Sequence, residues 1–324
     1  MEKGVGFLRK FIFSISIICL IAALGYIFYD LVFLSLKNGA VTNDIQKIAY
    51  DIPEEDKENS SDNDSPSSPK YNWKKLKDIN PEIVAWVKIP HTNIDYPVLQ
   101  HKEDNENDQY YLYRDYNKDY SQYGSVFIDY RSDMNSKNII LHGHHMIDGS
   151  MFSDLVKYGG ADPDIGFYKG SPYIYFSTPE EDCVYEIISV LKTPQDNSNN
   201  DFFNYMVGNF STNRDFLNYL YSIRIRSMIN CPVSSNENDQ LLTLSTCSYE
   251  YSGTIRTVVV ARKLRNDEPL SYVGGATENK NVLHGVGYYE KYGGTRPKEL
   301  TFEEDFKNLY WYDGKVNPQK SATP

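Results

Sequence analysis

An uncharged apolar segment near the N-terminus sets the strongest limit on how this chain can be arranged. Residues 11–29 contain 19 consecutive positions without a charge. As an α-helix this segment would be roughly 28 Å long, close to the hydrocarbon thickness of a bilayer. Lys3, Arg9 and Lys10 precede it, and positive residues favour the cytoplasmic side. We therefore expect a cytoplasmic N-terminus over residues 1–10, followed by one membrane-spanning helix.

A cleavable signal peptide is the alternative for this segment, because Ala22 and Ala23 resemble a cleavage site. The apolar run continues through residues 31–36, however, and is longer than a usual signal-peptide core. An uncleaved signal-anchor over residues 11–36 is therefore favoured. It predicts a single-pass protein of the cell membrane, with the remaining chain on the extracellular side.

A polar segment separates this anchor from the rest of the chain. Residues 37–70 are interpreted as a juxtamembrane segment, helical over 43–51, followed by an acidic linker rich in Ser and Pro. Seven acidic residues and the sequence SPSSP within 51–70 predict a solvated, extended tether. The net charge of the whole chain is −11, which argues against a nucleic-acid-binding protein.

Short apolar runs predict a mainly β domain that begins near Tyr71. Strands are expected over 83–89, 94–100, 124–129, 137–142, 173–177, 184–192, 242–247 and 254–260. Helices are expected over 73–78, 150–158, 201–207 and 212–228, the last with an apolar face made by Phe216, Leu217, Leu220 and Ile223. Because these strands do not alternate regularly with helices, a doubly wound parallel sheet is excluded in favour of a barrel.

The last two expected strands bring a cysteine and an arginine together. The first ends at Cys247, and the second carries Arg256. If the strands pair, the guanidinium favours the nucleophilic thiolate and can stabilise an oxyanion. The alternative is a buried structural cysteine with Arg256 in a surface ion pair. The chain has four cysteines, one of them Cys19 in the apolar segment, and no spacing indicates zinc or a disulfide framework. At least one thiol should therefore be free.

A histidine cluster supplies a candidate acid or base. Three of the six histidines lie in LHGHHM over 141–146. His142 and His144 share a strand face, so zinc is conceivable, but no third ligand has suitable spacing. A structural role is the second interpretation. The third is general acid–base catalysis, because histidine titrates near neutrality and can exchange protons with a thiol and a leaving amine.

Taken together, these segments resemble the sortases, and class B in particular. The likeness covers about residues 71–265 and rests on WVKI at 86–89, DYPVLQ at 95–100, GSVFIDYR at 124–131, LHGHHM at 141–146 with GSMF at 149–152, TLSTC at 243–247, and the arginine before VVV at 258–260. The order His, Cys, Arg is the sortase order. A helical insert, here between residues 192 and 241, is what class B adds between its sixth and seventh strands.

The resemblance implies a fold and a set of site residues. The fold is an eight-stranded sortase-like β-barrel with inserted helices, which forms the catalytic domain over residues 71–265. The catalytic residues fall on His144, Cys247 and Arg256, with His145 as the less favoured histidine. The expected substrate-binding residues are Leu99, Thr193, Ser245 and Thr246. No metal or other cofactor is implied.

The implied reaction is a transpeptidation on secreted proteins that carry a C-terminal sorting motif similar to Asn-Pro-Gln-Thr or Ser/Pro-Pro-x-Thr. Cys247 would form a thioacyl intermediate, which an amine of a peptidoglycan cross-bridge or lipid-linked precursor resolves. Pilus assembly on a pilin lysine is an alternative, as is a cysteine peptidase that hydrolyses the acyl enzyme. A non-enzymatic surface protein would instead keep Cys247 buried and unreactive.

Residues 266–324 form a C-terminal extension without a counterpart in the ordinary family domain. Thr301 and Glu304 have capping-box spacing and predict a short helix. Residues 317–319 read Asn-Pro-Gln, which suggests either an internal pseudosubstrate or a chance match in a polar segment. Because the family domain is complete near Arg265, deletion of 266–324 is expected to leave turnover of short peptides nearly unchanged.

Overall fold

The structure is a computed structural model that describes residues 2–52, 71–105, 109–159, 163–197, 201–248, 255–266 and 268–315. The acidic linker over 53–70, most of the turn after Ser248, and the Asn-Pro-Gln sequence at 317–319 lie outside the described residues. The chain divides into two compact units, Met1–Ile48 and Ala49–Pro324, each considered separately below.

Helix accounts for the described part of the N-terminal unit. It consists of α1 (Glu2–Phe28), a π-helical turn η1 (Tyr29–Phe33) and α2 (Leu34–Tyr50), whose end belongs to the second unit. Residues Arg9–Phe28 are long and apolar enough to cross a membrane, and their side chains are exposed. The helix predicted over 43–51 is confirmed by α2.

A closed barrel of eight strands forms the centre of the second unit. Its strands are β1 (Ile83–Lys88), β2 (Asp95–Leu99), β3 (Val126–Ile128), β4 (Asn138–His142), β5 (Tyr173–Ser177), β6 (Asp182–Pro194), β8 (Leu241–Ser248) and β9 (Ile255–Lys263). Around the barrel the order is β1-β2-β3-β4-β8-β9-β6-β5, with β5 closing onto β1. The pairs β2–β3 and β4–β8 are parallel. The predicted barrel is therefore confirmed.

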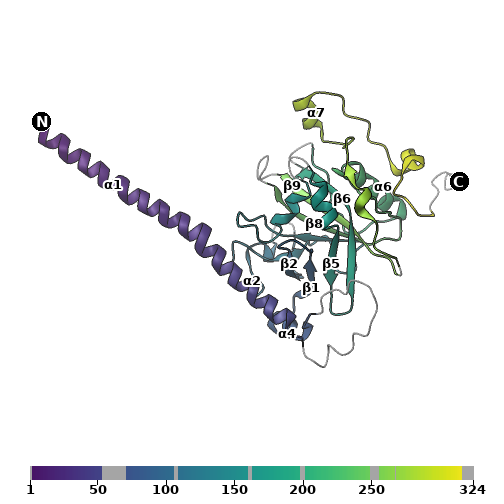
Figure 1. The fold of residues 1–324 in the computed structure, drawn as a ribbon, viewed down its shortest axis with the longest axis horizontal. Coiled ribbons are helices and arrows are strands. Elements are labelled where there is room, and N and C mark those ends of the chain that lie inside the picture. The colour runs from purple at the N-terminus through teal and green to yellow at the C-terminus, as the bar shows by residue number, and fades with distance from the viewer. Residues whose placement is uncertain are drawn as a thin grey trace. The chain divides into compact units, whose positions relative to one another are not determined.

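Short helical elements flank these strands. They are α4 (Trp73–Ile79), η2 (Tyr110–Tyr113), η3 (Ser153–Lys157), α5 (Ile165–Gly170) and α6 (Asn213–Ile225). Thr212 and Asp215 form a capping box that begins α6. Its predicted apolar face is buried in one cluster with Leu191 of β6 and with Val258 and Val260 of β9, and in Figure 1 α6 lies beside β6. The helix thus covers the outer face of these strands.

Two predicted helices differ from the structure. Residues 150–158 contain only the short 3₁₀ helix η3, because Met151 has a positive φ of 56° and forms an isolated bridge with His145. Residues 201–207 form no helix, because their backbone bonds to the barrel and makes short i to i+2 bonds in place of the i to i+4 bonds of a helix. The amide of Phe203 donates to Thr193 Oγ1 at 2.7 Å, and the carbonyl of Val207 accepts from Asn138 Nδ2 at 3.0 Å.

The C-terminal extension packs onto the same domain. Its described elements are η4 (Val273–Gly275), β10 (Thr277–Glu278), α7 (Val286–Tyr292), α8 (Phe302–Asp305) and η5 (Phe306–Asn308), and β10 pairs with β7 (Ile229–Asn230). The capping box at Thr301 is confirmed. Phe302 and Trp311 are 1% and 4% exposed and belong to the cluster beneath α6. The extension therefore shares a core with the domain, which removes the structural basis for expecting its deletion to be neutral.

A buried charged network joins the first residues of the extension to the barrel. Arg262 of β9 is fully buried and donates to Glu186 of β6 and to Glu268. Glu186 also accepts from the amide and the hydroxyl of Ser271. Buried charges are tolerated when they are paired and hydrogen-bonded in this way. This network fixes the path along which the chain leaves β9.

Candidate active site

The strand register places Cys247 and Arg256 directly opposite each other on β8 and β9. Thr193 of β6 is the next Cα partner of Arg256, so the three residues form one row across three strands. Directly opposed residues share a face of the sheet. Arg256 Nη1 donates to the sulfur of Cys247. The predicted meeting of thiol and guanidinium is therefore present in the structure.

The exposure of Cys247 separates it from the other soluble cysteines. All four cysteines of the chain are free, but Cys183 and Cys231 are buried, whereas Cys247 is partly exposed. Burial raises the pKa of Cys183 to about 11, and the same is true of Cys231. Those two side chains stay protonated thiols near neutrality, and a thiol is a poor nucleophile. Among the three cysteines outside the apolar N-terminal segment, Cys247 is the one that is both partly exposed to solvent and in contact with the Arg256 guanidinium.

The histidine loop is attached to the strand that carries Cys247. β4 runs parallel to β8, with His142 beside Ser245. The carbonyl of Gly143 accepts from Thr246 Oγ1 at 2.8 Å, and its amide donates to the carbonyl of Ser245 at 3.3 Å. A Cβ at position 143 would meet the ring of Phe152 at 2.7 Å, so a glycine is required there. These contacts hold the start of the loop against β8.

His144 lies in a half-buried position near the row of Cys247 and Arg256. Its Nε2 donates to the carbonyl of Leu112 at 2.8 Å, which leaves Nδ1 as the nitrogen with the lone pair. Burial lowers the pKa of His144 below its ordinary value, the Arg256 charge lowers it further, and the Leu112 hydrogen bond acts in the opposite direction. The imidazole is therefore mainly neutral near pH 7 and able to accept a proton at Nδ1.

The other two histidines of the cluster make different contacts. His145 Nδ1 donates to the backbone carbonyl of Cys247 at 2.9 Å, so it holds the end of β8 in place. His142 Nε2 contacts the buried carboxylate of Asp129 at 2.8 Å. Burial raises the pKa of Asp129, but His142 and Arg131 more than offset this, and the pKa is lowered overall.

These contacts bear on the zinc interpretation. His142 and His144 use their Nε2 atoms on separate partners, a carboxylate and a backbone carbonyl. Within the described residues, no group of three or more His, Cys, Asp and Glu side chains is arranged to hold a metal ion. The geometry instead brings together one partly exposed cysteine, one guanidinium and one neutral imidazole.

Three of the four predicted substrate-binding residues lie on the face that carries Cys247. Thr193 is in the row of Arg256, and Ser245 is two positions before Cys247 on β8. Leu99 pairs with Phe127, which in turn pairs with His142 beside Ser245. Strand alternation places Thr246 on the opposite face, where it holds the Gly143 carbonyl. Their role toward substrate stays a prediction.

Sequence reasoning missed the residues that cover this face. The hydroxyl of Tyr205 lies 2.7 Å from Ser245 Oγ, and the amide of Phe203 binds Thr193 Oγ1. Thr193 and Ser245 are consequently buried, at 2% and 1% exposed. The sequence predicts a helix over 201–207, and only the tertiary fold shows that these residues cover the strands. The carbonyl of Leu112 was also missed, because a backbone group has no signature in the sequence.

The chain is similar in sequence to known proteins. A family model described as a sortase domain matches residues 87–264. Sortase B of Staphylococcus aureus is 31% identical over 194 residues, which cover 59% of this chain and 74% of that protein. Sortase B of Listeria monocytogenes is 34% identical over 191 residues, which cover 58% of this chain and 72% of that protein.

Solved structures of sortase B are also similar to this chain. The crystal structure of sortase B from B. anthracis in complex with AAEK1 has a TM-score of 0.58 at 31% identity, and the match covers 72% of this chain and 99% of that chain. The Staphylococcus aureus sortase B–substrate complex has a TM-score of 0.52 at 32% identity, with 60% of this chain and 84% of that chain covered.

Proposed function

The chain belongs to the sortase family and is similar to its class B members, and from this we propose that it is a membrane-anchored cysteine transpeptidase acting through Cys247, His144 and Arg256. The observation that carries the proposal is the contact of Arg256 with the sulfur of Cys247, a partly exposed residue beside a loop that holds a neutral histidine. A binding module without enzymatic activity has no need of this combination.

The first half of the reaction cleaves the donor peptide. His144 Nδ1 takes the proton of the Cys247 thiol, and the sulfur attacks the carbonyl carbon of the sorting motif. The guanidinium of Arg256 stabilises the oxyanion that forms. As the carbon–nitrogen bond breaks, the protonated His144 gives its proton to the leaving amine, and a thioester remains on the enzyme.

The second half transfers the acyl group to the acceptor. The incoming amine loses a proton to His144, attacks the thioester carbonyl and releases the Cys247 thiolate. In the proposed setting, the donor is a secreted protein with a C-terminal sorting signal, and the amine belongs to a peptidoglycan cross-bridge or its lipid-linked precursor. Residues 11–36 anchor the enzyme to the membrane, residues 37–70 act as a tether, and residues 71–265 catalyse the reaction on the extracellular side.

Mass spectrometry of the purified protein tests this proposal. The protein is incubated with peptides that carry motifs similar to Asn-Pro-Gln-Thr or Ser/Pro-Pro-x-Thr, with and without an amine acceptor. We expect an acyl adduct on Cys247 and, with the acceptor, a ligated product that exceeds the hydrolysed one. A hydrolysed product that the acceptor leaves unchanged would indicate a peptidase instead, and the absence of any adduct or cleavage with all motifs would contradict the proposal.

A further inference from the structure

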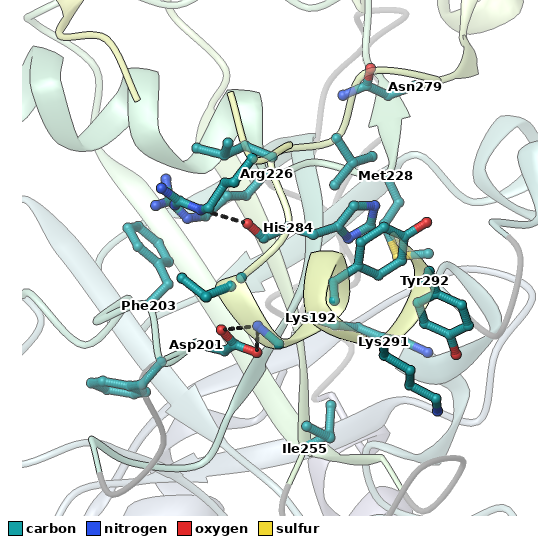
Figure 2. Close-up of a pocket in the computed structure, with 18 of the residues that line it drawn as sticks. Lys192, Asp201, Phe203, Arg226, Met228, Ile255, Asn279, His284, Lys291 and Tyr292 are labelled. Atoms are coloured by element: carbon teal, nitrogen blue, oxygen red, sulfur yellow. Dashed lines mark hydrogen bonds between the residues drawn. The ribbon is translucent and has the colours of Figure 1, made fainter. Parts of the chain in front are cut away.

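A cavity of about 830 Å³ lies where the C-terminal extension meets the insert and the ends of β6 and β9. Lys192 and Ile255 line it from the barrel, Phe203 and Arg226 from the insert, and residues 278–296 from the extension. Figure 2 shows Lys291 and Tyr292 of α7 across the cavity from Phe203 and Arg226. The extension, which lies outside the matched sortase-domain residues 87–264, therefore supplies most of the lining of this cavity.

The charge of the cavity is opposite to that of the chain. Its lining contains five basic side chains, Lys192, Arg226, Lys280, Lys291 and Arg296, against the two acidic side chains Asp201 and Glu278, although the chain carries a net charge of −11. A concave surface lined by one sign of charge concentrates ligands of the opposite sign. Arg226 and Arg296 both pair with Glu299, so the cavity favours an anionic ligand on the side of Lys280 and Lys291.

The acidic groups at the cavity are already engaged. Both carboxylate oxygens of Asp201 accept from the amide of Gly287, at 2.9 and 3.0 Å. Glu278 pairs with Lys280. Lys291, by contrast, makes no ion pair with the described residues, and its ammonium lies 5.0 Å from the centre of the Tyr292 ring. An incoming anion can therefore bind Lys291 without first displacing a protein carboxylate.

Aromatic rings form the rim beside this lysine. His284 stacks on Tyr288 with ring centroids 3.8 Å apart, and the Tyr292 ring lies 4.9 Å from Tyr288. Tyr292 is 60% exposed. Such a rim offers flat apolar surfaces next to a cation, which suits a peptide that carries both carboxylates and aliphatic groups.

The cavity reaches the strand ends that carry the candidate catalytic pair. Ile255 precedes Arg256 on β9, and Phe203 binds Thr193 in the same row. Neither Leu99 nor Ser245, the proposed donor-binding residues on β2 and β8, is among the lining residues. The cavity is therefore a separate site, at the same end of these strands as the candidate catalytic pair.

We propose that this cavity binds the carboxylates of the peptide that supplies the acceptor amine. The inference rests on the proposed transpeptidation, because a thioester on Cys247 needs a second peptide brought to its side. The carboxylates anchor that peptide at Lys291 and at Lys280, whose ammonium has three donors and can bind a second carboxylate beside Glu278. The aromatic rim holds the aliphatic part of the peptide. The amine is thereby directed toward the ends of β8 and β9.

Acceptor kinetics test the proposal. Two amine peptides of equal length are used, one with two glutamates and one with glutamines in their place. For the unmodified protein we expect the glutamate peptide to have a KM roughly 3- to 10-fold lower, as two partly exposed ion pairs would give, and this advantage to shrink with salt. Lys291→Gln and Lys280→Gln should each reduce the ratio of the two KM values, and Lys307→Gln, an exposed lysine outside the cavity, should keep it.

The outcomes separate this inference from the proposed function. Donor cleavage by water is followed in the same samples, and its absence from the unmodified protein would contradict the proposed function. If the donor is cleaved but the KM ratio is near one, or is the same in Lys291→Gln as in Lys307→Gln, the acceptor site is refuted. If Lys291→Gln raises the KM for the donor peptide and leaves the ratio of the two acceptor KM values unchanged, the cavity belongs to the donor side and the proposal is also refuted.

Discussion

Replacing Phe302 by alanine is the sharpest test of whether the C-terminal extension is part of the folded domain. Phe302 is 1% exposed, and its ring packs against Tyr312, Phe306 and Trp311 with centroid distances of 4.9, 5.5 and 6.5 Å. Its amide donates to Asn218 Oδ1 of α6 at 2.9 Å, and this bond survives the substitution. The change therefore removes the ring and little else.

The expected loss of stability follows from that burial. Transfer of a buried phenylalanine side chain out of water contributes about 1.5–3 kcal/mol. The cavity that remains raises the total to about 3–5 kcal/mol, because the cluster relaxes only in part. With an m-value of about 3 kcal/mol/M in urea, a loss of about 4 kcal/mol lowers the unfolding midpoint by roughly 1.3 M. Few single substitutions remove more than this.

Urea unfolding of the second compact unit, residues 49–324, measures this effect by tryptophan fluorescence and circular dichroism. Tyr272→Ala is the matched control, because Tyr272 also belongs to the extension but is 85% exposed. We expect the control to change the midpoint by less than a third as much. A loss below about 1 kcal/mol for Phe302→Ala would refute the shared core and restore the view that the domain is complete near Arg265.

The remaining predictions concern the candidate catalytic residues. Cys247→Ala should abolish cleavage of motif peptides and keep the native circular dichroism spectrum; continued turnover would exclude Cys247 as nucleophile. His144→Ala should lower kcat/KM by roughly 10²–10⁴-fold. His145→Ala should cost less, since its ring binds the backbone carbonyl of Cys247; the reverse order would identify His145 as the acid–base. Arg256→Lys should be strongly impaired because an ammonium lacks the planar fork of donors, and near-normal rates would show that only charge matters. Burial lowers the pKa of His144, so the unfolded chain binds more protons between that pKa and about 6.5. The stability from neutral His144 is therefore complete above about pH 6.5 and lost as the pH falls, and a His144→Gln variant with an equally steep loss would contradict this.

Local patterns in the sequence were sufficient to predict that Cys247 and Arg256 lie next to each other. Strand alternation and a short turn bring the two side chains to one face, and both strands are close in sequence. The loop with His144 could be joined to them only through the family resemblance. Its position depends on the parallel pairing of β4 with β8, and such a pairing of distant segments has no local signal.

Two further features could not be predicted from the sequence, for a related reason. They are the packing of residues 201–207 over the site and the packing of the C-terminal extension against the domain. Residues 201–207 have aromatic spacing compatible with a helix, but their backbone finds partners on the barrel at Thr193 and Asn138. Phe302 and Trp311 are likewise buried in one cluster with α6, which lies far earlier in the chain, so neighbouring residues do not indicate their role. In both cases tertiary contacts decide between conformations that the local sequence allows equally.

The order in which the chain is synthesised gives the β4–β8 pairing a further consequence. The hydrogen bond from Thr246 to Gly143 joins residues 103 positions apart, so the barrel stays open until β8 has been made. Part of the apolar face of α6 stays uncovered until Phe302 and Trp311 have also been synthesised. Domains that depend on such distant contacts fold slowly, and their exposed apolar surface promotes aggregation until folding is complete. We therefore expect this domain to fold after its synthesis is complete, with ribosome-bound chains that stop before residue 241 remaining sensitive to protease.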